Sequence, residues 1–279
     1  MSRKKERPNV LDLSALKLLD PKCTSESCLP SHIKHRVKID EKCDDLACNL
    51  KKSNINPIIL KPISGPANNT NWLSNHNIDH TLELWTIEMG GQLFISHYAM
   101  SDFNKVGSSE LSKFYKGSIL DVFSEKQKYE YIKPEYFGVE HNMFACVMNT
   151  DLSTGSGKHW ICMFIDFRDD PITIEFFDSG GDFPQHSFQE AMEKFKDDIL
   201  NFPEFLHYQY LVNSDGGRKA VKTIYSSDFQ HQYSSTECGV YALFYIRARI
   251  TGTPVYYFLK NKIPDERMLE LRKLLFTPI

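Results

Sequence analysis

The sequence predicts an α+β fold in which a central sheet is flanked by helices, preceded by a small, mainly helical N-terminal arm. Two apolar runs at residues 159–167 and 172–177 are rich in aromatic and branched residues and are typical of a β-hairpin. Residues 238–250 are apolar on nearly every face, which predicts a buried helix. Strands and helices of this kind pack in layers around one core.

The arm and the core differ in composition. Residues 1–64 are rich in Lys, Ser and Asn and are interrupted by prolines, whereas the core is predicted to span residues 65–279. The arm still holds apolar segments at residues 10–19 and 58–63, which a disordered tail normally lacks. We therefore expect the arm to dock on the core.

The arm also holds six side chains of the types that bind zinc. The spacing of four residues within each cysteine pair is at the wide edge of the usual range, and no tight glycine turn accompanies it. We therefore predict no metal site and two short helices with buried thiols, with zinc as the alternative. The six residues are Cys23, Cys28, His32, His35, Cys43 and Cys48.

Helix and strand signals follow one another in the core. Asp79 is predicted to cap a helix over residues 80–89 that ends at Gly90-Gly91. Residues 187–190 match a capping box that opens an amphipathic helix, which Pro203 ends. The apolar face of that helix is predicted at Phe188, Met192, Phe195 and Leu200, two further strands at residues 144–149 and 207–213, and a closing helix at residues 265–276.

The composition is that of a soluble globular protein. The chain has 279 residues, 41% of them apolar, and a net charge of -3, which argues against a general nucleic-acid binder. No signal peptide precedes it, and no apolar run approaches the ~20 residues needed to span a bilayer. We expect a protein kept in the cytosol of its host cell, where its seven cysteines are free thiols or metal ligands rather than disulfides.

Cys238 is the candidate nucleophile. It lies in the first turn of the predicted helix 238–250, with Ser235 or Thr236 available as the N-cap. A free thiol titrates at about 8.5, so it needs a helix N-terminus or a neighbouring imidazolium to become a thiolate at neutral pH. Gln232 lies just before the helix, where its amide and the backbone N–H of Cys238 can donate to a tetrahedral oxyanion.

The candidate base and its partner lie at the open end of the predicted hairpin. A turn centred between Asp169 and Asp170 places His159 opposite Gly180, with Asp178 as its diagonal neighbour on the same face. The carboxylate can then accept a hydrogen bond from one imidazole nitrogen while the other faces the thiol. A lone Cys or His is usually core packing, but four parts in the order His, Asp, Gln, Cys predict a cysteine protease.

Several strings of the sequence resemble known families. The set His159-Trp160, Asp178, Gln232 and Cys238-Gly239 resembles the SUMO-specific and adenovirus-type cysteine proteases. Longer strings resemble the polyprotein-processing cysteine proteases of African swine fever virus and related large DNA viruses. These strings are GPANNTNWLSNHNIDHTLELW (65–85), NTDLSTGSGKHW (149–160), DSGG (178–181) and HQYSSTECGVYALFYIRAR (231–249).

The resemblance implies a SUMO-protease-like or adenain-like core and a set of roles, with no cofactor. The swine fever protein carries Asn as the third catalytic member where this chain has Asp178, and both side chains can orient the imidazole. The implied site residues are catalytic His159, Asp178 and Cys238, oxyanion-binding Gln232, and substrate-binding Asn149 and Trp160.

The resemblance also implies a substrate. A large flat ring at Trp160 can lie over an extended backbone and favour glycines, although ordinary core packing would also explain it. The implied activity is cleavage of viral structural polyproteins at Gly-Gly-X sites during virion maturation, in the host cytoplasm at assembly sites and in the virion. Open alternatives are a deSUMOylating or deubiquitinating isopeptidase acting on ubiquitin-like proteins, a CoA-dependent acetyltransferase and a non-catalytic virion protein. No nucleic-acid or membrane partner is expected.

Overall fold

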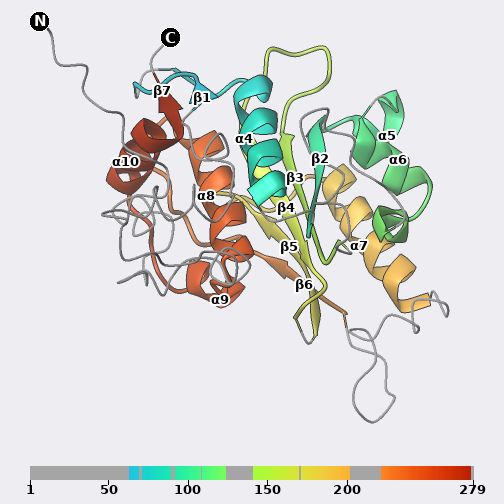
Figure 1. Ribbon diagram of the computed structural model, residues 1–279. Helices are drawn as coiled ribbons and strands as arrows, with labels where there is room; N and C mark the ends of the chain where they lie inside the picture. Colours follow the sequence, from blue (N-terminus) through green and yellow to red (C-terminus); the bar gives the residue numbers. More distant parts are fainter. Residues whose placement is uncertain are drawn as a thin grey trace, which may run out of the picture.

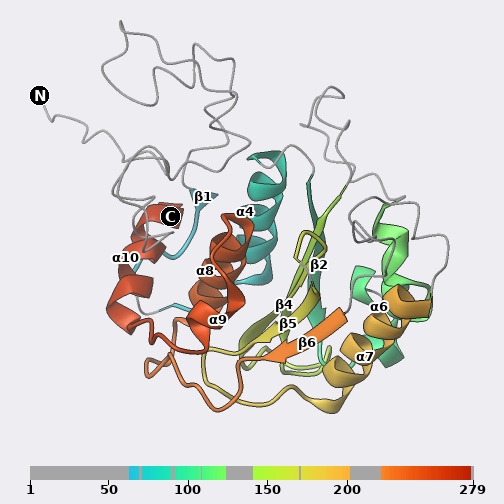
Figure 2. The ribbon, with the colours of Figure 1, turned by 90° about the horizontal axis from the view of Figure 1, so that it is seen from below.

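A mixed sheet with helices on both faces forms the body of the protein (Figures 1 and 2). The computed structural model describes residues 63–68, 71–88, 92–107, 109–123, 141–169, 171–201 and 221–277. Helices α4, α8, α9 and α10 cover one face of the sheet, and α5, α6 and α7 cover the other (Figure 2). The predicted α+β fold is therefore confirmed. No helix in the described parts of the chain is long and apolar enough to cross a membrane.

The sheet has the strand order β2-β3-β4-β5-β6. The middle strands β3, β4 and β5 pair antiparallel, and the outer strands β2 and β6 each pair parallel to their neighbours. Every residue of the three middle strands is buried, because helices cover both faces. The bounds are β2 Leu93–Met100, β3 Met143–Asn149, β4 Trp160–Asp166, β5 Ile172–Phe177 and β6 Val221–Tyr225.

The helices and two short strands complete the described chain. Strand β1, the last two residues of the predicted arm, pairs parallel with β7 near the end of the core. The bounds are β1 Ile63–Ser64, α4 Asn75–Glu88, α5 Phe103–Val106, α6 Glu110–Lys116, the 3-10 helix η3 Ile119–Phe123, α7 His186–Asn201, α8 Cys238–Ile250, α9 Val255–Phe258, α10 Asp265–Leu275 and β7 Phe276–Thr277.

The β4–β5 hairpin has the predicted register. Cys162 pairs with Phe177 and Asp166 with Thr173, which is the pairing that places His159 and Asp178 at the same end. The predicted strand at 144–149 is β3, and the predicted closing helix is α10. The expected strand at 207–213 lies outside the described residues. So do the arm up to residue 62, with its six candidate zinc ligands, and Gly90-Gly91.

Helix α8 is the buried central helix that the sequence predicts, and all thirteen of its residues are buried. Its predicted caps are wrong, because the N-cap is Glu237 and makes no side-chain capping bond. The hydroxyl of Thr236 donates instead to Oε1 of Glu237 at 2.7 Å. Cys238 is thus the first residue of the helix, as predicted.

Two other helix starts also differ from the prediction. Helix α4 begins one turn before residue 80, because Ser74 and Asn77 bond reciprocally through side chain and backbone N–H. Asp79 lies inside α4 and accepts the N–H of Tyr98 on β2 at 3.0 Å. Helix α7 begins at His186, and the hydroxyl of Ser187 donates to the Ser101 carbonyl at 2.6 Å rather than capping.

The core face of α7 is predicted almost correctly. Phe188, Met192 and Phe195 are buried, but the fourth core position is Ile199, whereas Leu200 is half-buried. The observed spacing of four, three and four residues keeps one stripe of the helix on the sheet.

The C-terminal end of α8 is fixed by charge. Arg249 contacts the carboxylates of Glu175 on β5 at 2.8 Å and Asp166 on β4 at 3.2 Å. The side chains of all three residues are at most 3% exposed. The sequence explains Arg249 only by the helix dipole, whereas the structure shows a buried ion cluster that sets α8 against the hairpin.

We expect Arg249→Met to lower the free energy of unfolding by about 3–5 kcal/mol, because it leaves the buried carboxylate of Glu175 without its charged partner, whereas Asp166 keeps its pair with Arg168. Urea denaturation followed by circular dichroism measures the change. Arg267→Met is the matched control, since the Arg267–Glu270 pair is exposed and should contribute less than about 1 kcal/mol. A loss no larger than that of the control would show that the cluster does not hold α8.

Candidate active site

The start of α8 brings the candidate nucleophile to the edge of the sheet. Cys238 is 3% exposed. Its neighbour Gly239 packs so closely on Leu73 that an added Cβ would come within 3.1 Å of the leucine side chain. A small residue after the cysteine therefore lets the first turn of α8 approach the segment before α4.

His159 and Asp178 meet at the open end of the β4–β5 hairpin. The Nε2 atom of His159 lies 2.7 Å from Oδ1 of Asp178, the contact that the predicted register requires. The same oxygen accepts the N–H of Gly180 at 2.7 Å, and the N–H of Asp178 donates to the Ser226 hydroxyl at 2.9 Å. The carboxylate is thus held by the N–H of Gly180, and the backbone of Asp178 by the hydroxyl of Ser226.

Cys238 is the other side chain that raises the pKa of His159, which places the thiol beside the imidazole. Because Nε2 faces the carboxylate, Nδ1 is the nitrogen left for the thiol. Burial alone would lower the pKa of His159, but the interactions with Asp178 and Cys238 outweigh it and raise that pKa to about 10. His159 is therefore an imidazolium at neutral pH, a charge that favours a neighbouring thiolate.

Gln232 is buried on the irregular segment that leads into α8. Its Oε1 accepts the Ser179 hydroxyl at 2.7 Å, and its Nε2 donates to the Ser234 carbonyl at 2.7 Å. One amide hydrogen is committed in this way, which leaves the other for a ligand. The sequence reasoning did not single out Ser179, although it follows Asp178 in the DSGG string.

Trp160 both packs in the core and lines a groove. Its indole N–H donates to the Leu73 carbonyl at 2.9 Å, and its ring meets Tyr98 edge-on with the centroids 6.1 Å apart. The same ring is part of the wall of a groove of about 750 Å³. Trp160 is thus both a residue of the core and part of the groove wall, and its contact with substrate stays a prediction.

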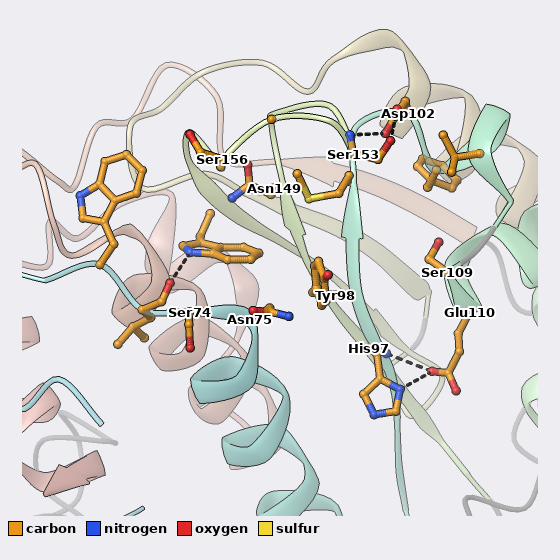
Figure 3. Close-up of a pocket in the computed structure, with 18 residues that line it drawn as sticks. Ser74, Asn75, His97, Tyr98, Asp102, Ser109, Glu110, Asn149, Ser153 and Ser156 are labelled. Atoms are coloured by element: carbon orange, nitrogen blue, oxygen red, sulfur yellow. Dashed lines mark hydrogen bonds and ion pairs between the residues drawn. The ribbon is translucent and has the colours of Figure 1, made fainter. Parts of the chain in front are cut away.

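The groove runs along β2, from the start of α4 to the start of α6 (Figure 3). Asn149 faces it beside Ser156, and the paired His97 and Glu110 lie at its other end (Figure 3). Oδ1 of Asn149 is used by the N–H groups of Asp151 and Lys158, so the amide nitrogen is the atom that can reach a ligand.

The groove contains residues that the sequence reasoning missed. Trp72 is 46% exposed and lies on its wall, and Tyr98 faces it from β2 (Figure 3). Trp72 stands in the GPANNTNW string, which was used for the resemblance but not for the site. Tyr98 has no local sequence signal, because only the pairing of β2 with β3 brings it near Trp160.

Comparison with known proteins identifies the family. The C-terminal catalytic domain of the Ulp1 protease family matches residues 143–279. Two isolates of African swine fever virus carry relatives, named a SUMO-1 cysteine protease in one and a cysteine protease in the other. Each is 35% identical over 258 residues, which cover 91% of this chain and 83% of the relative. The chain belongs to the Ulp1 family of cysteine proteases.

A solved structure agrees with this assignment. The crystal structure of the African swine fever virus protease matches with a TM-score of 0.60 and 31% identity, over 95% of this chain and 88% of the solved one. The predicted enzyme class, a cysteine protease, is thus confirmed. The individual roles of the site residues stay predictions, which variants of this Ulp1-family enzyme can test.

Because the pKa of His159 is raised, we expect kcat/KM to stay high well into the alkaline pH range. Hydrolysis of a peptide amide needs the imidazolium to protonate the leaving nitrogen, so kcat/KM should fall only as the pH rises toward about 10. Asp178→Asn removes the carboxylate that raises this pKa and should move the alkaline limb to lower pH. The measurement is kcat/KM against pH for both proteins. An unchanged limb in the variant would show that Asp178 does not set the protonation of His159.

Proposed function

We propose that this protein is a viral cysteine endopeptidase that cleaves structural polyprotein precursors at Gly-Gly-X sites during virion maturation. The proposal also places it at assembly sites in the host cytoplasm and in the virion. The observation that carries it is the hydrogen bond of His159 to Asp178, with the thiol of Cys238 beside the imidazole at the N-terminus of a buried helix.

The chemistry assigns one role to each group. The thiolate of Cys238 attacks the carbonyl carbon of the scissile bond, and the carbonyl oxygen becomes an oxyanion. Imidazolium His159 gives its proton to the leaving amine as the C–N bond breaks, which leaves a thioester. His159 then takes a proton from water, the hydroxide attacks the thioester, and the acid and the thiol are released.

The oxyanion has donors close to Cys238. The N-cap of α8 makes no side-chain bond to the first turn, so the backbone N–H of Cys238 is a natural donor at this helix start. Gln232 supplies the second donor through its uncommitted amide hydrogen, and Ser179 orients that amide from the other side. Two such donors are what a tetrahedral intermediate needs.

The groove gives the proposed specificity a physical basis. A chain that runs from Cys238 across Trp160 passes over a large ring, where a glycine backbone fits and a side chain would clash. Residues before the two glycines then enter the groove of about 750 Å³, where Asn149 can bond their backbone. This volume suits an extended peptide segment.

A ubiquitin-like conjugate is the second candidate substrate. The name of one relative, a SUMO-1 cysteine protease, favours it. The catalytic chemistry is the same for a peptide bond and an isopeptide bond, so the two substrates differ only in what the groove binds. A gel assay with a structural polyprotein and with SUMO and ubiquitin conjugates separates them, and cleavage of the conjugates alone would overturn the polyprotein assignment.

Cys238→Ser should abolish hydrolysis, and Gln232→Ala should lower kcat by about a hundredfold, the usual effect of losing one oxyanion donor. Alkylation of Cys238 by iodoacetamide should stay at the wild-type rate in Gln232→Ala, because the thiol and imidazole are untouched. Gln185→Ala is the control, since Gln185 is exposed and bonds only a loop carbonyl. Loss of alkylation in Gln232→Ala would make Gln232 a structural residue instead.

The glycine preference can be measured with matched peptides. Replacing either glycine before the scissile bond by alanine should lower kcat/KM by about 10- to 200-fold, because one methyl group must fit where Trp160 leaves no room. Peptides that begin with the two glycines should have a higher KM than peptides that carry further residues before them, because only the longer peptides fill the groove. Equal cleavage of Gly-Gly and Gly-Ala peptides would contradict the proposed role of Trp160.

A further inference from the structure

The segment between the oxyanion donor and the nucleophile has no regular structure of its own. Residues 231–237 form neither helix nor strand, yet they fix the distance between Gln232 and Cys238. An irregular segment can hold its end residues in place only if other elements bond its backbone. Helix α10 supplies such bonds at two points.

The first point is Asp265, which begins α10. Its Oδ2 accepts the N–H of Tyr233 at 3.0 Å and the N–H of Ser234 at 2.9 Å. Its Oδ1 accepts the hydroxyl of Tyr241 on α8 at 2.9 Å. One carboxylate therefore holds the two residues after Gln232 and ties them to the nucleophile helix.

The second point is Arg272, two turns further along α10 and so on the same face. Its side chain is fully buried, as is that of Glu237, and Nε donates to Oε2 of Glu237 at 2.9 Å. Its Nη2 donates to the Thr236 carbonyl at 2.7 Å. The guanidinium thus holds the two residues before Cys238.

The same guanidinium reaches the wall of the groove. Nη1 of Arg272 donates to the carbonyls of Asn71 at 2.7 Å and Pro66 at 3.2 Å. The segment after Asn71 carries Leu73, which packs on Gly239 and accepts the indole N–H of Trp160. Arg272 therefore bonds both the turn before the nucleophile and the segment that supports Trp160.

We propose that Asp265 and Arg272 are positioning residues that make α10 a clamp on the catalytic segment 232–238. Asp265 sets the oxyanion side, and Arg272 sets the nucleophile side together with the wall of the groove. The inference rests on the proposed roles of Gln232 and Cys238, and it assigns neither clamp residue any contact with the substrate.

The two halves of the clamp predict different kinetic changes. Asp265→Ala removes the acceptor of both N–H groups, so kcat should fall about tenfold or more with KM within about twofold, since a small displacement of an oxyanion donor is costly. The iodoacetamide reaction of Cys238 should stay at the wild-type rate. Arg272→Lys cannot bond four acceptors at once, so both kcat and the alkylation rate should fall about tenfold or more.

Arg267→Lys is the matched control on the same helix, because Arg267 forms only an exposed pair with Glu270 and should behave as wild type. Circular dichroism melts establish that each variant is folded at the assay temperature. If Arg272→Lys does not fold, Asp265→Ala decides, because a wild-type kcat in that folded variant overturns the clamp. Wild-type kcat and alkylation in a folded Arg272→Lys overturn its nucleophile half.

The assay also separates this inference from the proposed function. Alkylation of Cys238 needs no substrate, so the effect of Arg272→Lys on the thiol is measured whether or not Gly-Gly peptides are cleaved. A wild-type alkylation rate that is unchanged in His159→Gln would count against the proposed catalytic pair. A rate that depends on His159 but not on Arg272 would count against the clamp alone.

Discussion

The burial of helix α8 is the constraint on which the rest of the structure depends. All thirteen of its residues are buried, between the sheet on one side and α10 on the other, with α4 beside it on the same face of the sheet (Figure 2). Its far end is fixed to β4 and β5 through Arg249, and its near end carries Cys238. The same two strands lead to His159 and Asp178 at their opposite ends. The ion cluster and the site at His159 and Asp178 therefore fix the two ends of α8 against the same β-hairpin.

Charge rather than apolar contact fixes the position of α8 along its axis. Apolar burial is not directional, so it fixes the axial position of a helix only through the fit of its side chains. A buried arginine is directional, because each lost hydrogen bond leaves a desolvated group behind. Arg249 at one end and the Arg272–Glu237 pair at the other both have this property. Buried ion pairs are weak evidence for stability, but they suit an element whose register decides whether a thiol meets an imidazole.

The sequence predicts the parts of the site that depend on local periodicity and misses those that depend on tertiary contacts. The hairpin register follows from two strands and a short turn, so the meeting of His159 with Asp178 could be predicted. The three helix caps could not, because Asp79 and Ser187 find partners on distant segments and Thr236 bonds its neighbour. Ser179 and Leu73 were missed for a similar reason, since each acts through a contact that only the folded chain creates.

The groove and the three candidate catalytic residues are built from different segments of the chain, and Leu73 contacts both. His159 and Asp178 lie at the end of the hairpin and the thiol on α8, whereas the groove is built from β2, the helices beside it and the loops before α4 and after β3, with Trp160 of β4 in its wall (Figure 3). Leu73 joins them, because its carbonyl holds the ring of Trp160 and its side chain packs on the residue after Cys238. Leu73 therefore supports both the ring of Trp160 and the first turn of α8. If substrate runs over Trp160 as proposed, its fit and the position of the nucleophile depend on this one residue.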